Sequence, residues 1–336
     1  MARRTAPQTQ LNLFGAVEPV AAPAAVGAAA VTPEVLELAR RLPPGLYLGT
    51  SSWTFPGWQG LVYDRAASVS TLARYGLAAY GQHPLFRTVG LDRTFYAPLP
   101  AADLRAYADA VPAAFRFLVK AHAWCTQPFL RESHTPGQSG WQANTVFLQP
   151  DYAIEHVVQP YLEGLGSKAG PLLWQFSPLD VPAVGGASRF AERLHAFLAA
   201  LPRGPLYAVE LRNTSLFTTA YRDVLADLGV CHCFNVHPSM LPLAEQMRLI
   251  APEAGPALLV RWMLHPSQRY EGARSRYEPF DHLVDHDLQN RQQIAAMYHR
   301  VRAAGRCAFV IANNKAEGSS PCTLRHLAEA ITQTVQ

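Results

Sequence analysis

Eight short β-rich runs recur along the chain, and each is followed by loop residues and then by an amphipathic stretch. The runs are residues 46–51, 86–92, 115–120, 171–176, 206–211, 230–234, 257–263 and 307–312. Strands that alternate with helices pair in parallel through right-handed crossovers, and eight such units close into a barrel. An open doubly wound sheet would normally show a glycine-rich phosphate turn after an early strand, and none is present. We therefore predict an α/β fold, a single (β/α)₈ TIM barrel.

The start of the chain differs in composition from the rest. Residues 17–31 are almost entirely alanine, valine, proline and glycine, with prolines too frequent for a helix and no alternation for a strand. We predict a flexible, disordered tail over residues 1–32 and one folded domain over residues 33–336. A helix over residues 33–41 is expected to open the domain, with Thr32 as its N-cap and Pro33 in its first position.

Composition narrows the class of protein. Apolar residues make up 49% of the chain and charged residues 16%, which suits a packed globular core. The net charge of +4 is scattered, which does not indicate a dense basic stripe for nucleic acid, so direct nucleic-acid binding is left open. The five cysteines form no CxxC pair, and no signal peptide or membrane-spanning stretch is apparent. We expect a cytoplasmic protein with no membrane partner.

The expected strand ends carry an ordered set of motifs. They are GTSSW at 49–53 with Trp58, TFY at 94–96, FRFLVK at 115–120, GPLLWQF at 170–176 with Pro178, AVELR at 208–212 with Ser215, Val260-Arg261, and Asn313-Asn314 with Gly318. In this order they resemble the YecE-like barrels, a domain of unknown function loosely related to sugar isomerases. The resemblance covers residues 46–330 and implies the same barrel.

The chain departs from the resembled family at several pocket positions. The resemblance implies a glutamate at Gly90, an asparagine at Asp92, a histidine at Gln127 and aspartates at Asn235 and Met263. These differences remove titratable groups from the expected pocket. A metal-dependent barrel needs several carboxylates and histidines around its ions, and this chain offers Glu210, Asp92, His122 and His265. We predict no metal and no other cofactor.

Glu210 and Arg212 lie two residues apart on the fifth strand and therefore face the same side of the sheet. At the barrel mouth Glu210 would be the leading general acid or base, and Arg212 would hold it ionised or bind a substrate anion. The alternative is a structural ion pair that caps the barrel. Arg261 lies in an apolar strand and must meet an anion or a carboxylate such as Glu210 or Asp92.

Lys120 and His122 share one side of the third strand. The lysine would bind phosphate or carboxylate, or act as a nucleophile if burial lowers its pKa; the alternative is a solvated loop lysine. His122 is a catalytic candidate, although a lone histidine is more often a hydrogen-bonded structural residue.

Other residues at strand ends are candidates for substrate binding. Trp53 and Tyr96 would form a stacking platform for a sugar or a base; the alternative is that their rings only pack against the protein. Asn313 and Asn314 lead to Gly318, where barrels often bind phosphate, or else build a turn. The remaining two candidates are Gln175 and Asn235. Four residues, Cys231, Cys233, Asn235 and His237, alternate along the sixth strand as the ligands of a metal site could. The alternative is that the small cysteines fill barrel layers, and no carboxylate joins them nearby.

Two connections are longer than a barrel needs, residues 121–150 after the third strand and residues 264–280 after the seventh. Both are expected on the face where barrels build active sites, where they would form a lid.

The tail carries the sharpest short motif, Gln10-Leu11-Asn12-Leu13-Phe14. It resembles the pentapeptide by which bacterial polymerases and repair proteins bind the ring-shaped sliding clamp. A disordered segment can offer Leu11, Leu13 and Phe14 to an apolar groove while Gln10 makes a polar contact. The alternative is that these side chains dock on the barrel itself.

Three functions remain open from the sequence. The first is an enzyme, an isomerase, lyase or hydrolase, that uses Glu210 for proton transfer on an anionic or phosphorylated sugar or nucleotide and is recruited to DNA by the clamp. The second is a non-catalytic ligand-binding or adaptor barrel. The third is a nuclease or lyase that acts on damaged DNA.

Overall fold

The computed structural model describes residues 10–11, 17–18, 26–131 and 140–333. In these residues eight parallel strands form a closed barrel, and each pairs with the next in chain order. The strands are β3 (Leu46–Thr50), β4 (Thr88–Leu91), β5 (Arg116–Lys120), β8 (Ala169–Gln175), β9 (Tyr207–Glu210), β10 (Cys231–Val236), β11 (Leu258–Trp262) and β12 (Ala308–Ala312). The last strand pairs with the first, from Ala308 opposite Leu46 to Ala312 opposite Thr50. The predicted α/β barrel and its eight strands are confirmed.

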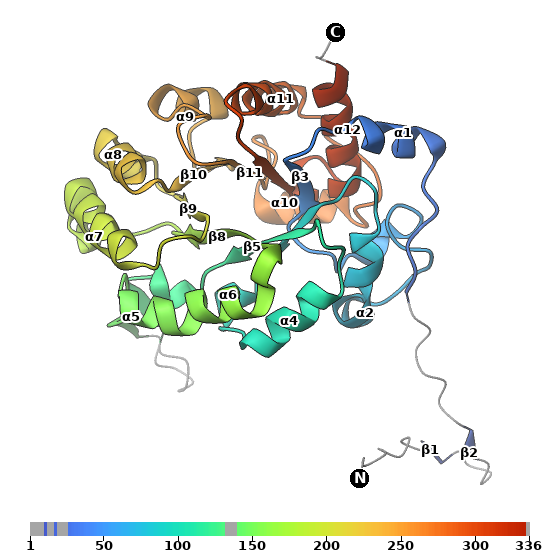
Figure 1. Ribbon diagram of the computed structural model, residues 1–336, viewed down its shortest axis with the longest axis horizontal. Coiled ribbons are helices and arrows are strands. Elements are labelled where there is room, and N and C mark those ends of the chain that lie inside the picture. Colours follow the sequence, from blue (N-terminus) through green and yellow to red (C-terminus); the bar gives the residue numbers. More distant parts are fainter. Residues whose placement is uncertain (1–9, 12–16, 19–25, 132–139, 334–336) are drawn as a thin grey trace.

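Helices surround the barrel in a ring (Figure 1). The helices are α1 (Pro33–Arg41), α2 (Val69–Gly81), α3 (Arg93–Tyr96), α4 (Ala101–Asp109), α5 (Pro150–Ala153), α6 (Gln159–Leu165), α7 (Gly186–Ala200), α8 (Thr219–Leu228), α9 (Leu243–Leu249), α10 (Tyr270–Tyr277), α11 (Leu288–Ala303) and α12 (Ser320–Gln333). A π-helical turn, η3 (Ile154–Val158), joins α5 to α6. In the view of Figure 1, helix α10 lies behind the strands rather than among the outer helices. No helix among the described residues is long and apolar enough to span a membrane.

Short 3₁₀ turns complete the connections: η1 (Pro56–Trp58), η2 (Ala123–Cys125), η4 (Gly166–Lys168), η5 (Pro182–Val184), η6 (Thr214–Leu216) and η7 (Asn314–Ala316). Local sequence sets several helix ends. Ser68 caps α2 by accepting a hydrogen bond from the amide of Thr71, and Thr218 caps α8 in the same way. Helix α1 has the predicted bounds with Pro33 in its first turn, but the Thr32 side chain makes no capping hydrogen bond.

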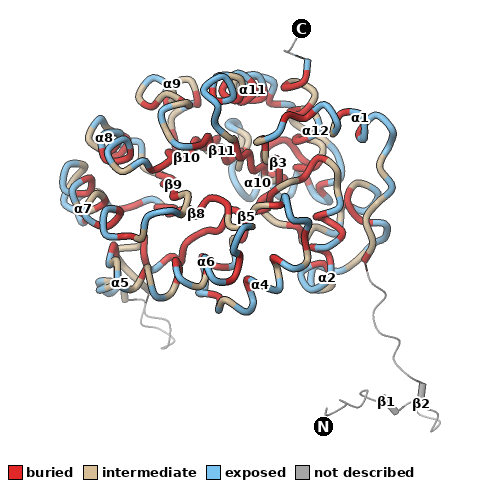
Figure 2. The backbone as a smooth tube through the Cα atoms, in the orientation of Figure 1, coloured by how far each residue is buried: buried red, intermediate tan, exposed pale blue. Residues whose placement is uncertain are grey.

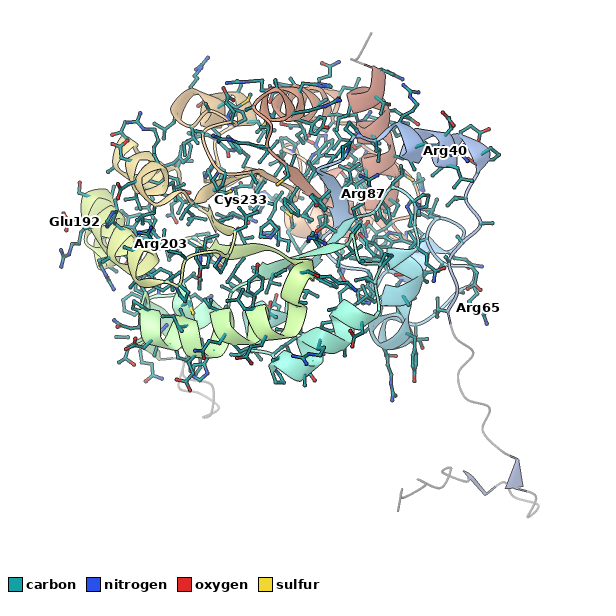
Figure 3. The ribbon with its side chains drawn as sticks, in the orientation of Figure 1. Arg40, Arg65, Arg87, Glu192, Arg203 and Cys233 are labelled. Atoms are coloured by element: carbon teal, nitrogen blue, oxygen red, sulfur yellow. The ribbon has the colours of Figure 1, made fainter. Side chains whose placement is uncertain are left out.

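The strands are buried on both faces, which explains their nearly continuous apolar sequences. Figure 2 shows the buried strands inside and helices whose outer faces are exposed. Side chains that fill the barrel interior come from alternate strand positions and include Leu118, Leu173, Ala208, Cys233, Leu259, Phe309 and Ile311. Figure 3 shows Cys233 in this interior and Arg40, Arg65 and Glu192 on the outside.

A glycine allows β3 and β4 to lie against each other. A Cβ atom at Gly49 would lie 1.9 Å from the carbonyl oxygen of Thr88. Because that oxygen belongs to the backbone of the neighbouring strand, the strand itself would have to move.

The two long connections have structure of their own. After β5, strands β6 (Phe129–Arg131) and β7 (Trp141–Ala143) pair as an antiparallel hairpin. After β11, the chain forms α10, and at the start of this connection the His265 amide donates a hydrogen bond to the Lys315 carbonyl in the loop after β12. His134 of the first connection lies outside the described residues.

The folded part of the chain extends into the segment expected to be a tail. Val26 is buried, and the Ala29 amide donates to the carbonyl of Val62. Further upstream, β1 (Gln10–Leu11) pairs with β2 (Val17–Glu18). Residues 26–32 therefore pack on the barrel.

Candidate functional site

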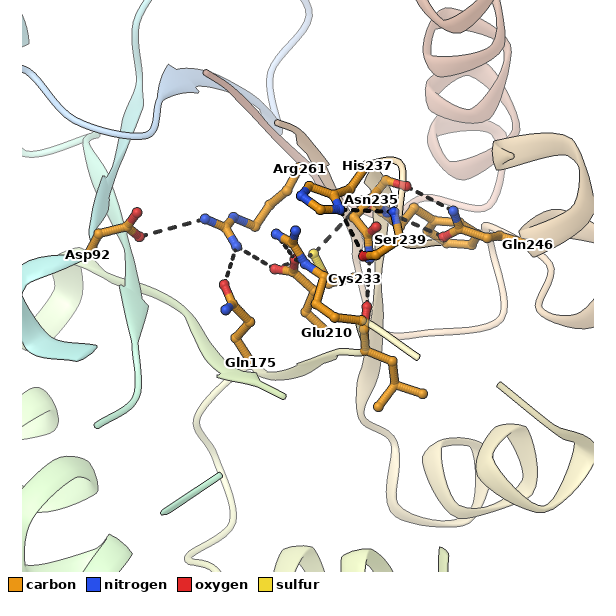
Figure 4. A network of polar contacts seen from close by, with 12 residues as sticks. Asp92, Gln175, Glu210, Cys233, Asn235, His237, Ser239, Gln246 and Arg261 are labelled. Atoms are coloured by element: carbon orange, nitrogen blue, oxygen red, sulfur yellow. Dashed lines mark hydrogen bonds and ion pairs between the residues drawn. The ribbon is translucent and has the colours of Figure 1, made fainter. Parts of the chain in front are cut away.

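The inward-facing side chains change from apolar to polar at the carboxyl ends of the barrel strands. The successive inward positions are Leu118 and Lys120 on β5, Leu173 and Gln175 on β8, Ala208 and Glu210 on β9, and Leu259 and Arg261 on β11. This is the end of the barrel where enzymes of this architecture place their catalytic groups. Figure 4 shows Asp92, Gln175, Glu210 and Arg261 meeting there from four strand ends. We call Asp92, Lys120, Gln175, Glu210, Arg212 and Arg261 the central cluster.

Glu210 is fully buried, and each of its carboxylate oxygens meets an arginine. Oε1 lies 2.6 Å from both Nε and Nη2 of Arg212, and Oε2 accepts a hydrogen bond from Nη1 of Arg261. Burial by itself raises the pKa of Glu210, but the charges of Arg212 and Arg261 outweigh it and hold the pKa at about 2. Glu210 is therefore a weak base, and its geometry favours the ion-pair interpretation, in which it positions the two arginines.

Arg261 joins three strands from inside the barrel. Besides Glu210, its Nη1 donates to Oε1 of Gln175 at 2.8 Å, and its Nη2 lies 3.7 Å from Oδ1 of Asp92. Burial lowers the pKa of Arg261, but Glu210 and Asp92 raise it above its ordinary value. The expectation that Arg261 meets carboxylates is confirmed. One donor, Nε of Arg261, and one acceptor, Oδ1 of Asp92, are buried and remain without a hydrogen bond to any described residue.

Lys120 ends β5 with its amine inside the barrel mouth. The residue is 7% exposed, and Nζ lies 3.8 Å from the ring centre of Phe95. Burial, chiefly, lowers its pKa to about 8, because the opposing effects of Asp92 and Arg261 partly cancel. The Lys120 carbonyl accepts a hydrogen bond from the Thr94 hydroxyl at 2.6 Å, which ties β5 to the turn after β4. The alternative of a solvated loop lysine is wrong.

His122 turns away from the central cluster. Its Nδ1 lies 2.8 Å from the hydroxyl of Tyr152 in α5, and its ring lies 5.3 Å from that of Trp124. Burial and the nearby His156 lower its pKa. Among the described residues, no contact joins His122 to Lys120 or Glu210.

The two aromatic candidates lie in different environments. Trp53 is 7% exposed, and its indole donates to the Leu72 carbonyl at 3.0 Å and packs edge-on against Tyr107. Tyr96 is 80% exposed at the rim. The structure does not bring them together as one platform, and the contacts of Trp53 match the packing alternative.

The three asparagine candidates form hydrogen bonds with neighbouring segments of the chain. Asn313 donates to Ser51 and accepts from the Lys315 amide, and Oδ1 of Asn314 accepts from both the amide and the hydroxyl of Ser320. Nδ2 of Asn235 donates to the Leu211 carbonyl at 3.1 Å, while its buried Oδ1 has no partner among the described residues. Asn313 and Asn314 therefore build the turn after β12.

The positions at which this chain differs from the resembled family lie in different environments. A Cβ at Gly90 would lie 3.1 Å from the Ser51 carbonyl oxygen, so a longer side chain there needs β3 to give way slightly. Gln127 lies outside the central cluster, in the wall of a surface cavity of about 540 Å³ that Pro178 also lines. Met263 is half-buried.

Two further polar side chains lie near the mouth. His237 continues the inward positions of β10, and burial together with Arg212 lowers its pKa to about 4. Lys315, in η7, is 8% exposed beside the ring of Tyr270. The alternation along the sixth strand had already drawn attention to His237, but nothing in the sequence indicates that Lys315 is buried.

Metal-ligating groups do not gather in the part of the chain that the structure describes. No three histidine, cysteine or carboxylate side chains lie close enough to hold an ion there. Burial raises the pKa of Cys231 to about 12 and that of Cys233 also, so both thiols stay protonated at neutral pH.

Comparisons with known proteins agree with the fold and with the family resemblance seen in the sequence. The family described as "Protein of unknown function DUF72" matches residues 47–336. A DUF72 family protein from Thermotoga maritima MSB8 has 18% identity and a TM-score of 0.59, over 84% of this chain and 98% of that one. A DUF72 family protein from Enterococcus faecalis V583 has 16% identity and a TM-score of 0.58, over 85% and 95%. The comparison with curated proteins found no match.

Proposed function

Because the chain belongs to the DUF72 family, whose description gives no activity, we propose from the site itself that the barrel mouth binds a small anionic molecule and that Lys120 exchanges a proton with it. A phosphorylated sugar or a nucleotide is the expected class. The observation that carries this proposal is the charge of the central cluster. The cluster has three cations, Lys120, Arg212 and Arg261, and only two carboxylates, Glu210 and Asp92.

The spare polar groups of the cluster support the same conclusion. Nε of Arg261 and Oδ1 of Asp92 are buried without hydrogen-bond partners among the described residues, and an unsatisfied buried group costs about 1–3 kcal/mol. An anion with hydroxyl groups, such as a sugar phosphate, offers both an acceptor for the arginine and a donor for the carboxylate. The mouth is therefore better suited to a polar anion than to an apolar ligand.

Lys120 is the group best suited to proton transfer. A general acid or base works best when its pKa lies near the working pH, and the pKa of Lys120, at about 8, meets that condition where that of Glu210, at about 2, does not. Glu210 then acts as the positioning residue that fixes Arg212 and Arg261. This chemistry fits an isomerase or lyase better than a passive binding barrel.

Ligand binding tests the proposal before any substrate is known. We would measure the melting temperature of the protein with a panel of sugar phosphates, nucleotides and the matching neutral sugars and nucleosides. We expect a phosphorylated compound to raise the melting temperature, since a ligand that binds only the folded state stabilises it. The rise should be lost in Arg212→Met and kept in Arg189→Met, an exposed arginine paired with Glu192. Equal shifts in the two variants would overturn the assignment.

We also propose that the tail motif binds a sliding clamp. Leu13 and Phe14 lie outside the described residues, and only the extended pair Gln10–Leu11 is described. The support is the sequence: large apolar residues in a stretch otherwise rich in alanine and proline. In a pull-down, the clamp should fail to capture the Leu13→Ala, Phe14→Ala double variant and should still capture a matched Val17→Ala, Val20→Ala variant. Equal capture of both would show that the motif is not used.

A further inference from the structure

A second cavity lies at the rim of the barrel and shares no residue with the central cluster. It has a volume of about 500 Å³ and lies between the loop after β3, helix α10 with the segment that follows it, and the η7 turn after β12. Its lining includes Phe55, Tyr270, Arg274, Glu278, Phe280 and Lys315. Small-molecule sites commonly measure about 300–1,000 Å³, so the size is suitable for a ligand.

Lys315 brings a buried cation to this cavity. The residue is 8% exposed, and Nζ lies 4.3 Å from the ring centre of Tyr270. Among the residues that the structure describes, no carboxylate forms an ion pair with Lys315. Nζ is not among the fully buried polar atoms without a partner, so the amine keeps some contact with solvent, and there it lacks a counter-charge.

The η7 turn holds Lys315 rigidly. Its amide donates to Oδ1 of Asn313 at 3.0 Å, and its carbonyl accepts from the amide of His265 at 2.9 Å. The amides of Ala316 and Gly318 donate to the carbonyls of Asn313 and Asn314. Barrels often bind phosphate through loop amides after the seventh and eighth strands, but here the turn uses these amides itself. The lysine amine is therefore the group that remains for an anion.

The other charges of the cavity cancel, and much of its wall is aromatic. Nε of Arg274 lies 3.1 Å from Oε1 of Glu278, so this pair adds no net charge. Phe55 and Phe280 meet edge to face at 5.7 Å, and Phe280 is buried. The wall thus combines one unpaired cation with a ring-lined apolar surface.

We propose that this cavity binds a small aromatic anion, whose phosphate or carboxylate pairs with Lys315 and whose ring lies against Phe55 and Phe280. The site does not depend on the chemistry proposed for Lys120. The ligand must carry both parts, because the anion alone would leave the aromatic wall in water and the ring alone would leave Lys315 unpaired.

Three probes test the two halves of the proposal by isothermal titration calorimetry of the intact protein: phenyl phosphate, inorganic phosphate and benzyl alcohol. We expect phenyl phosphate to bind at least about tenfold more tightly than either fragment, a difference of about 1.4 kcal/mol. Lys315→Met should weaken phenyl phosphate binding by at least about tenfold as well. Arg189→Met is the control and should change it little, because this exposed arginine lies outside the cavity.

Two outcomes would overturn the inference. One is unchanged phenyl phosphate binding in Lys315→Met; the other is inorganic phosphate binding as tightly as phenyl phosphate. Loss of phenyl phosphate binding in Lys120→Met, with binding kept in Lys315→Met, would place the anion in the central cluster, which overturns this site and leaves the proposed function standing. Folding is checked by the melting temperature of Lys315→Met, which should stay close to that of the unsubstituted protein, since methionine is a similarly long, unbranched side chain.

Discussion

Arg261 on β11 reaches across β10 to donate a hydrogen bond to the carboxylate of Glu210 on β9, and both side chains are at least 98% buried. Arg212 meets the other oxygen of the same carboxylate. The pair is fixed by the barrel because both residues lie at inward positions near the ends of their strands. Its strength follows from that burial, since water cannot screen the two charges.

Removal of the Glu210 charge should destabilise the fold. In Glu210→Gln the neutral amide leaves Arg261 buried beside one distant carboxylate, and a broken buried pair typically costs about 3–5 kcal/mol. Urea unfolding followed by circular dichroism measures the change in free energy of unfolding. Glu192→Gln, which breaks the exposed pair with Arg189, is the control and should leave that free energy nearly unchanged. Equal effects would mean that the buried pair adds nothing.

The stabilisation by Glu210 should disappear in acid. Its pKa falls from 4.5 to about 2 on folding, so between these values the unfolded chain binds more protons and stability decreases as the pH falls. The contribution is complete above about pH 5 and lost as the pH passes through about 2. We expect the difference in unfolding free energy between the protein and Glu210→Gln to shrink over this window. A difference that is constant from pH 6 to pH 3 would contradict the lowered pKa.

The barrel could be predicted from the sequence because its strands are buried on both faces and read as apolar runs. Runs such as LLVRW in β11 and AFVIA in β12 are interrupted only where a polar residue faces the barrel mouth. Period-2 alternation put Glu210 and Arg212 on one side of their strand, and the apolar strand around Arg261 indicated that its charge needs a partner. Alternation of side chains is a property of a single strand, so it can be predicted without knowing which strands are its neighbours.

The roles of those residues depend on contacts that the sequence does not contain. Glu210 was expected to transfer protons, but two arginines from positions 2 and 51 residues further along meet its oxygens. Alternation also failed after β5, because η2 begins directly after His122 and the histidine turns to Tyr152. Lys315 lies beside the ring of Tyr270, which is distant in the sequence, so no local pattern reveals this contact.

Lys120 should titrate well below an ordinary lysine. The chain has three lysines, Lys120, Lys168 and Lys315, so reductive methylation with ¹³C-formaldehyde gives a simple NMR spectrum, and methylation keeps the charge. We expect the resonance that Lys120→Met removes to titrate with a midpoint near pH 8, because burial disfavours the charged amine. The Lys168 resonance, assigned with Lys168→Met, serves as a reference. A midpoint for Lys120 above pH 10 would remove the basis for proton transfer at this residue.

The close approach of β3 and β4 makes Gly49 intolerant of any side chain. In Gly49→Ala the new Cβ would meet the Thr88 carbonyl oxygen at 1.9 Å, a backbone atom that can move only with its strand. Because overpacking a well-packed core already costs about 1–3 kcal/mol, we expect this variant to lose at least that much stability or to be insoluble. Gly272→Ala in α10 is the matched control: its Cβ would meet only the Gln268 side chain at 3.7 Å, and alanine favours a helix by roughly 0.5–1 kcal/mol over glycine. Thermal unfolding of the two variants side by side measures both effects, and a Gly49→Ala protein as stable as Gly272→Ala would show that the two strands can separate without cost.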